Sequence, residues 1–161
     1  MEVVFYTDGG ARNMGDGEYA RAGCAIACSE IDIERGFYLG DGISSNMAEY
    51  EAIIAAIKVT IDLGHNTLRL ISDSELCVKH IQKEVLNWPG YTCSDPKLRW
   101  RLDIVKNLVK KLDYFMIEHT RRDNNKIADA LVRSATKAEI KVPLPSSWED
   151  NLWKELPHST R

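Results

Sequence analysis

The spacing of apolar and polar residues predicts strands in the first quarter of the chain. Residues 3–7 form a strand-like run that ends at Asp8-Gly9-Gly10, where two glycines permit a sharp turn. Residues 22–28 and 31–39 are two further candidate strands, joined by a short polar link. We therefore expect an antiparallel meander, with Asp8 at the C-terminal end of its first strand.

Helical spacing follows. Apolar residues recur three or four positions apart between Met47 and Ile61, and Leu63-Gly64 provides a C-cap. Residues 67–72 read as a strand that closes at Asp73. Two further helices are predicted, separated by a loop over residues 88–96; their apolar faces are Cys77, Val78, Ile81 and Val85, then Leu98, Leu102, Val105, Val109 and Leu112.

A last strand over residues 114–119 precedes a final helix that Asn124 or Asn125 caps and that contains Asp129 near its start. The order βββαβααβα predicts an α/β fold. We expect a five-stranded mixed sheet, made of an antiparallel meander plus parallel strands, with helices flanking it.

Length and composition favour one domain. A chain of 161 residues can bury one core, and we assign that domain to residues 1–138. Residues 139–161 form a C-terminal extension, irregular because of its prolines, which we expect to be partly disordered. Trp148 and Trp153 are the side chains that would dock part of it on the domain.

No apolar run approaches the roughly 20 residues of a membrane helix, and the first residues do not resemble a signal peptide. We therefore expect a soluble, monomeric protein in the cytoplasm, with the nucleus as the alternative. Cys24 and Cys28 would lie roughly 13 Å apart on one strand, too far for a disulfide. With no paired Cys/His spacing for zinc either, we expect all four cysteines to be reduced.

The net charge of −3 conceals an uneven distribution. Residues 1–75 hold 5 Lys and Arg against 13 Asp and Glu, whereas residues 76–111 hold 8 against 3. A basic zone beside an acidic one suits a metal-dependent nuclease, although a solvated helical face has the same composition. We expect Lys97, Arg99 and Arg101 to contact phosphates, with Arg101 the most fully in solvent.

Four acids, Asp8, Glu49, Asp73 and Asp129, fall at predicted strand ends or helix starts. Each has a purely structural explanation: a turn, a capping box that starts at Asn46, an N-cap, and a favourable position in the helix dipole. Together they would share one edge of the sheet, where like charges repel unless cations bind. Oxygen ligands select Mg²⁺ or Mn²⁺, and two such ions can activate water and hold a phosphate.

The four acids lie in motifs that follow one another along the chain: Tyr6-Thr7-Asp8-Gly9-Gly10, Asn46-Met47-Ala48-Glu49-Tyr50, Ser72-Asp73-Ser74 and Asn125-Lys126-Ile127-Ala128-Asp129-Ala130-Leu131. In this order and spacing they resemble a known family, type 1 ribonuclease H, over about residues 1–138. The resemblance implies a magnesium-dependent endonuclease that cuts the RNA strand of RNA·DNA hybrids and leaves 3′-hydroxyl and 5′-phosphate ends. By position, Asp8 would bridge two metal ions, Asp129 would complete the site that activates water, and Glu49 with Asp73 would complete the site that faces the leaving group.

The same resemblance implies substrate contacts. Glu49 and backbone groups near Gly10, Ala11 and Asn13 would read the 2′-hydroxyl. Ser44-Ser45-Asn46 replaces the family's frequent Thr-Asn-Asn, which grips a DNA phosphate, and the basic loop of some members is abbreviated to residues 88–101. His119 would assist proton movement or product release; the alternative is a strand-end histidine bonded to backbone.

Three other functions compete with this interpretation. One is a nuclease or integrase of the same superfamily that cuts DNA with the same metals. Another is an inactive hybrid-binding module from a reverse transcriptase, against which the four retained acids argue. The third is a small-molecule-binding α/β domain, which the lack of a glycine-rich phosphate loop after the first strand disfavours.

Overall fold

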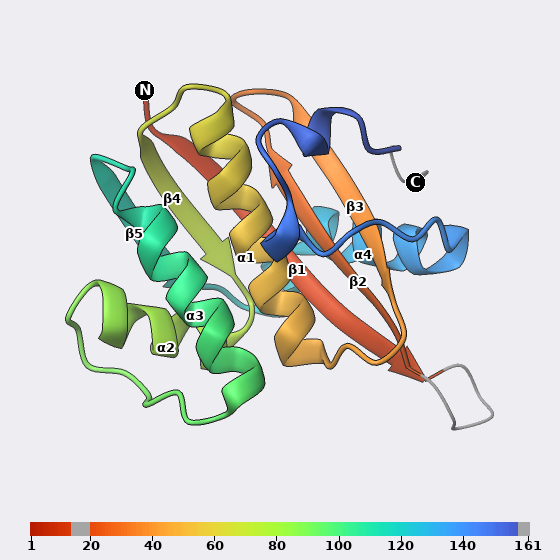
Figure 1. Cartoon of the computed structure of the whole chain (residues 1–161), viewed down its shortest axis with the longest axis horizontal. Helices are drawn as coiled ribbons and strands as arrows, with labels where there is room; N and C mark the ends of the chain where they lie inside the picture. Colours follow the sequence, from red (N-terminus) through yellow and green to blue (C-terminus); the bar gives the residue numbers. More distant parts are fainter. Residues whose placement is uncertain (14–19, 158–161) are drawn as a thin grey trace.

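The computed structural model describes residues 1–13 and 20–157, with side chains at all of these positions except 13 and 20. Within these residues the chain forms one five-stranded mixed sheet (Figure 1). The order is β3-β2-β1-β4-β5, with antiparallel pairing from β1 to β3 and parallel pairing of β1 with β4 and β4 with β5. This confirms the predicted fold. The strands are β1 (Val3–Asn13), β2 (Ala20–Cys28), β3 (Ile33–Gly40), β4 (Thr67–Ser72) and β5 (Tyr114–His119).

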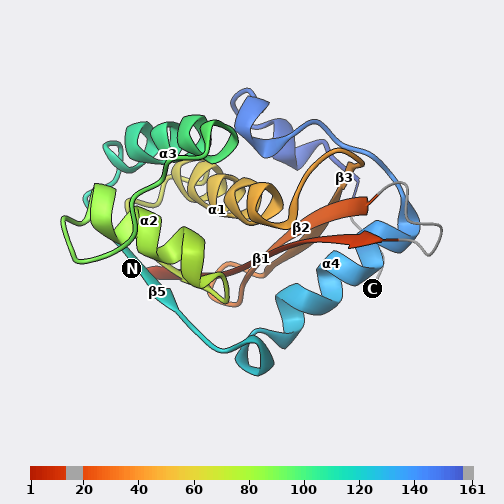
Figure 2. The same cartoon turned by 90° about the horizontal axis from the view of Figure 1, so that it is seen from below.

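Helices cover both faces of the sheet, as the edge-on view in Figure 2 shows. One face carries α1 (Ser45–Asp62), α2 (Glu75–Val85) and α3 (Pro96–Val109), and the other carries α4 (Lys126–Ala138). The main core lies between the sheet and α1, which is buried along most of its length because α3 packs over it. A smaller core of Ala25, Ala27, Ala128, Leu131 and Val132 seats α4 on the sheet.

The first strand does not end at Asp8, as the glycine pair had suggested, but continues to Asn13. Gly9 is required by packing and not by a turn, since a Cβ atom there would lie 2.3 Å from the backbone carbonyl carbon of Ala48. The absent side chain lets the first turn of α1 rest directly on β1. Asp8 therefore lies inside a strand.

The helix starts also differ in detail from prediction. Ser44, and not Asn46, caps α1 by accepting a hydrogen bond from the Met47 amide at 3.2 Å. The capping explanation for Glu49 was therefore wrong. Asn125 occupies the N-cap position of α4, but its side chain makes no capping bond and points back to the sheet.

Within residues 139–157, the C-terminal extension is irregular apart from two short 3₁₀ turns, Pro145–Ser147 and Leu152–Lys154, and it packs on the domain. It crosses the edge of β3, where Lys141 bridges to Tyr38, and then runs over α1 (Figure 1). Trp148 is 6% exposed and packs edge-on against Phe37 with the ring centroids 5.1 Å apart, and the indole of Trp153 donates to Asp62. Both tryptophans dock as anticipated, so this segment joins the main core.

All four cysteines are free and buried, as expected. Within the described residues, no helix is both long and apolar enough to span a membrane.

Candidate active site and metal centre

Three of the four predicted acids meet at one point. Asp8 comes from β1, Glu49 from the first turns of α1, and Asp73 directly follows β4. Ligand oxygens of the three lie within 4.8 Å of one another. Parallel pairing of Thr7 with Ser72 brings Asp8 and Asp73 level, and the close approach at Gly9 brings Glu49 down onto them.

Two carboxylates of the cluster have raised pKa values. Burial, and then the charge of Asp73, raise the pKa of Asp8 from 3.8 to about 7, although the Gly9 amide donates to its Oδ1 at 2.9 Å. Burial, and then the charges of Asp8 and Asp73, raise the pKa of Glu49 well above its ordinary value. Without a counterion these carboxylates bind protons at neutral pH, so a cation would compete for the same oxygens.

The donor set fits a hard divalent cation. All three ligands are carboxylates, which suit Mg²⁺, Ca²⁺ or Mn²⁺. Oε2 of Glu49 is buried and has no hydrogen-bond partner among the described residues. A buried carboxylate oxygen without a partner is costly in a folded protein unless it binds an ion or water. Asp8, Glu49 and Asp73 therefore form a candidate metal centre.

Asp129 lines the same cleft from α4 but stands apart from the three-carboxylate cluster. Its oxygens accept from Arg133, one turn further along α4, and from Arg122 at 3.5 Å. Burial acts to raise the pKa of Asp129, but the hydrogen bond and charge of Arg133, with Arg122, outweigh burial and leave that pKa below its ordinary value. Asp129 is thus an ionised carboxylate held beside the cluster.

The cleft over the carboxylates has a volume of about 360 Å³. Of the predicted substrate-binding residues, Gly10, Ala11 and Ser45 line it, and Ser45 Oγ accepts from the Ala11 amide at 3.1 Å. Ser44 and Asn46 lie exposed at the start of α1, next to the cleft. The side chain of Asn13 lies outside the described residues.

The sequence did not identify several residues that line the cleft or lie beside it. Arg12 and Arg122 line the cleft and give it positive charge, and Val132 supports it from α4. Arg133 was also overlooked, although its position four residues after Asp129 places the two side chains on one helix face. That spacing could have identified Arg133 from the sequence. Arg122 lies in the three-residue 3₁₀ turn Arg122–Asn124, which is too short to show a repeating pattern of apolar residues.

His119 ends β5, where it pairs with Ser72, the residue before Asp73. Its side chain is exposed, and Thr120 continues the parallel ladder by donating its amide to the Ser72 carbonyl at 2.9 Å. The histidine thus lies on the strand next to the one that delivers Asp73, in a position open to solvent.

The predicted phosphate grip on α3 needs correction. Arg101 is 1% exposed, donates to Glu51 Oε2 at 2.6 Å and to the Lys97 carbonyl at 2.7 Å, and cannot reach a ligand at the surface. Arg99 forms a two-pronged ion pair with Glu84 at 2.7 Å. Lys97 is the exposed member of the three.

Solved structures with this fold include ribonuclease H proteins. The crystal structure of RNase H1 from Halobacterium salinarum has a TM-score of 0.67 and 28% sequence identity, covering 86% of this chain and 99% of that one. LC11-RNase H1 in complex with an RNA/DNA hybrid has a TM-score of 0.68 and 27% identity, with 86% and 99% covered. The fold and the carboxylate cleft define a protein of the ribonuclease H-like class.

Sequence comparison places the chain more narrowly. The model of the family described as reverse transcriptase-like matches residues 13–135. A curated relative, ribonuclease HI of Halobacterium salinarum, is 31% identical over 135 residues. The chain belongs to the type 1 ribonuclease H family. The matched region makes up 83% of this chain and 63% of that curated relative.

Proposed function

We propose that this protein is an endonuclease that hydrolyses the RNA strand of RNA·DNA hybrids with two Mg²⁺ ions, leaving 3′-hydroxyl and 5′-phosphate ends. The observation that carries the proposal is the meeting of Asp8, Glu49 and Asp73 within 4.8 Å, with one buried Glu49 oxygen unpaired. Three carboxylates packed together repel one another and do not stabilise the fold by themselves, whereas a bound cation offsets their repulsion.

The four acids would have different roles in binding metal. Asp8, Glu49 and Asp73 would hold metal, and Asp129, kept ionised by its arginines, would complete a second position at the cleft wall. Bound metal ions would supply an activated water and stabilise charge on the scissile phosphate. Gly10 lines the cleft and has no side chain of its own, which would let a sugar approach the sheet closely.

Arginines at the cleft support a nucleic-acid substrate. Arg12 and Arg122 line the cleft, and Arg133 lies beside it on α4. Arg122 and Arg133 pair with Asp129 here, and both are more than half exposed, so each has room to move from the carboxylate to a phosphate oxygen. One solved structure supports an RNA·DNA hybrid as the substrate: LC11-RNase H1, which is 27% identical to this chain, has been solved in complex with an RNA/DNA hybrid.

His119 is proposed as the group that moves a proton at the leaving oxygen or aids product release. Its exposed position on the strand beside Asp73 supports this role, because solvent access lets the imidazole exchange protons between turnovers. The four free, buried cysteines support a reducing compartment, and we propose the cytoplasm.

One assay tests reaction and substrate together. The pure protein is incubated with end-labelled RNA·DNA hybrid, duplex RNA and duplex DNA, each with Mg²⁺ or with EDTA. We expect cleavage of the RNA strand of the hybrid alone, and only with Mg²⁺. Equal cleavage of duplex DNA would instead assign the chain to the DNA-cutting nucleases of the same fold, and hybrid binding without cleavage would assign it to inactive binding modules.

A further inference from the structure

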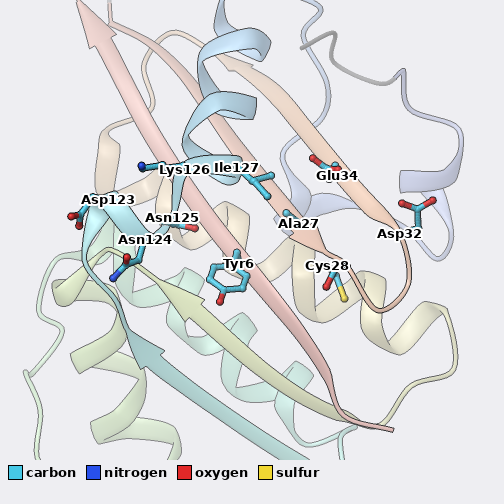
Figure 3. Close-up of a pocket in the computed structure, with 11 residues that line it drawn as sticks. Tyr6, Ala27, Cys28, Asp32, Glu34, Asp123, Asn124, Asn125, Lys126 and Ile127 are labelled. Atoms are coloured by element: carbon cyan, nitrogen blue, oxygen red, sulfur yellow. The ribbon is translucent and has the colours of Figure 1, made fainter.

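A second hollow, of about 530 Å³, opens on the face of the sheet that carries α4 (Figure 3). We call it the sheet groove; Tyr6 of β1 and Ala27 of β2 form its floor, and Ile127 of α4 and Glu34 of β3 border it. Tyr6 and Asp8 are two positions apart on one strand, so their side chains leave the same face of the sheet. The groove therefore lies beside the metal cleft, yet the two share no lining residue.

The groove exposes apolar surface that the fold does not cover. Tyr6 is 38% exposed and Ile127 is 58% exposed, and both border the same hollow. α4 seals the sheet only from Ala128 onward, through its contacts with Ala25 and Ala27. A hollow of this size with an apolar floor and a few polar groups is the usual form of a binding site.

Charge at the rim selects the ligand. Asp32, Glu34 and Asp123 line the groove, and Lys126 is the one cation among its lining residues. Asp32 makes no ion pair with another described residue, and the pair of Asp123 with Arg121, at 3.9 Å, is exposed and weak. This rim repels phosphate, which sets the groove apart from the surface that would hold a hybrid, and it attracts a positively charged group.

A buried acceptor at the groove lacks a donor. Asn125 is 2% exposed, and its Oδ1 has no hydrogen-bond partner among the described residues. Its Nδ2 donates to the Thr7 carbonyl at 2.8 Å and weakly to Asp73 Oδ2 at 3.4 Å, which holds the side chain in place. Figure 3 shows this side chain directed between Tyr6 and Ile127. An unpaired buried acceptor favours a ligand that brings an N–H donor.

We propose that the sheet groove binds an arginine-bearing segment of a partner polypeptide. A guanidinium of the segment can pair with the Asp32 carboxylate, and a backbone N–H further along the segment can donate to Asn125. An apolar neighbour of that arginine would cover Ala27 and Ile127. The polypeptide nature of the ligand follows from this apolar share of the groove, which a small cation would leave in water.

The inference does not rest on the proposed nuclease activity, because it concerns residues outside the metal cleft.

The test is a titration followed by ¹H–¹⁵N NMR, with saturating Mg²⁺ so that the probe does not compete for the metal carboxylates. The probes are the blocked peptides acetyl-Leu-Arg-Leu-Arg-amide and acetyl-Leu-Glu-Leu-Glu-amide, and agmatine as a small guanidinium compound. We expect saturable shifts with the arginine peptide at the Asn125 side-chain amide and at the backbone amides of Ala27 and Ile127.

Variants make the result specific. Asp32→Asn with Asp123→Asn should weaken binding of the arginine peptide about tenfold, and Ile127→Ser should weaken it as well. Asp150→Asn, which removes an exposed carboxylate on the C-terminal extension, serves as the matched control and should leave the affinity unchanged. Equal binding of the glutamate peptide, agmatine binding as tight as the arginine peptide, or shifts that map outside the groove would each overturn the proposal.

Discussion

Replacing Arg101 should lower the free energy of unfolding of this protein without changing its affinity for nucleic acid. The guanidinium and the Glu51 carboxylate are 2% and 0% exposed and lie 2.6 Å apart. The other Glu51 oxygen accepts from the Ser146 amide at 2.8 Å, so the ion pair joins α3 and α1 to the C-terminal extension. Arg101→Ala leaves the buried Glu51 carboxylate without its ion-pair partner.

The cost follows from that burial. Removing one member of a buried pair typically destabilises a protein by about 3–5 kcal/mol. In a domain of this length each kcal/mol lowers Tm by roughly 2–4 °C, so a loss of about 6–20 °C is expected. Replacing both residues, as Arg101→Met with Glu51→Leu, removes the uncompensated charge and should recover most of that loss.

Urea unfolding followed by circular dichroism measures the effect, and hybrid binding at several salt concentrations measures the role in recognition. Arg99→Ala is the control, because its ion pairs with Glu84 and Asp103 are about one-third exposed on the arginine side and should contribute only about 1 kcal/mol. A loss below about 1 kcal/mol in Arg101→Ala, with a flatter salt dependence of binding, would refute the structural role and restore a phosphate contact.

Three further outcomes are expected. His119→Ala should lower the hybrid-cleavage rate by roughly ten- to a hundredfold with Tm unchanged, and an unaffected rate would favour a merely structural histidine. Gly9→Ala should cost at least about 1–3 kcal/mol and most of the activity, because the added methyl group would overlap the Ala48 backbone; a Tm equal to that of the parent would contradict this packing. The folded-state pKa of Asp8, about 7, lies above its ordinary 3.8, so protonation stabilises the metal-free fold below pH 4 and that contribution disappears as pH rises through 7. In EDTA, the stability of Asp8→Asn relative to the parent should therefore increase between pH 4 and 7 by up to about 4 kcal/mol, and saturating Mg²⁺ should abolish the trend in the parent.

Sequence periodicity predicted the strands, the helices and their order because it reports which face of each element is buried. It could not predict the reach of β1, since Gly-Gly after Asp8 suits a turn as well as a close contact with another element. The contact with Ala48 depends on where α1 lies in space. Local patterns therefore misplaced the end of the strand while still placing Asp8 correctly on it.

Arg101 shows a different limit. It follows Leu98 by three positions and precedes Val105 by four, so helical spacing already puts it on the buried face. The prediction nevertheless took Leu98, Leu102 and Val105 as the buried face and left Arg101 in solvent. The carboxylate that pairs with this arginine lies 50 positions away in the sequence, so local spacing does not show it. In the extension, likewise, the prolines report local backbone preference and not the core into which Trp148 packs.

The four acids illustrate what sequence can and cannot specify. Their positions at strand and helix boundaries predicted one cleft, and the structure assembles Asp8, Glu49 and Asp73 there. The pairing of Asp129 with Arg133 and Arg122 depends on side-chain orientation at the start of α4, which spacing alone does not determine.

The central claim is that this carboxylate cluster cuts RNA through bound metal, and the most direct measurement compares the parent with Asp73→Asn. Both are given a labelled RNA·DNA hybrid at saturating Mg²⁺, and hybrid affinity is measured in parallel. We expect cleavage to disappear in Asp73→Asn while the affinity stays within a few-fold, because the arginines at the cleft remain. Near-normal turnover in this variant would contradict the account.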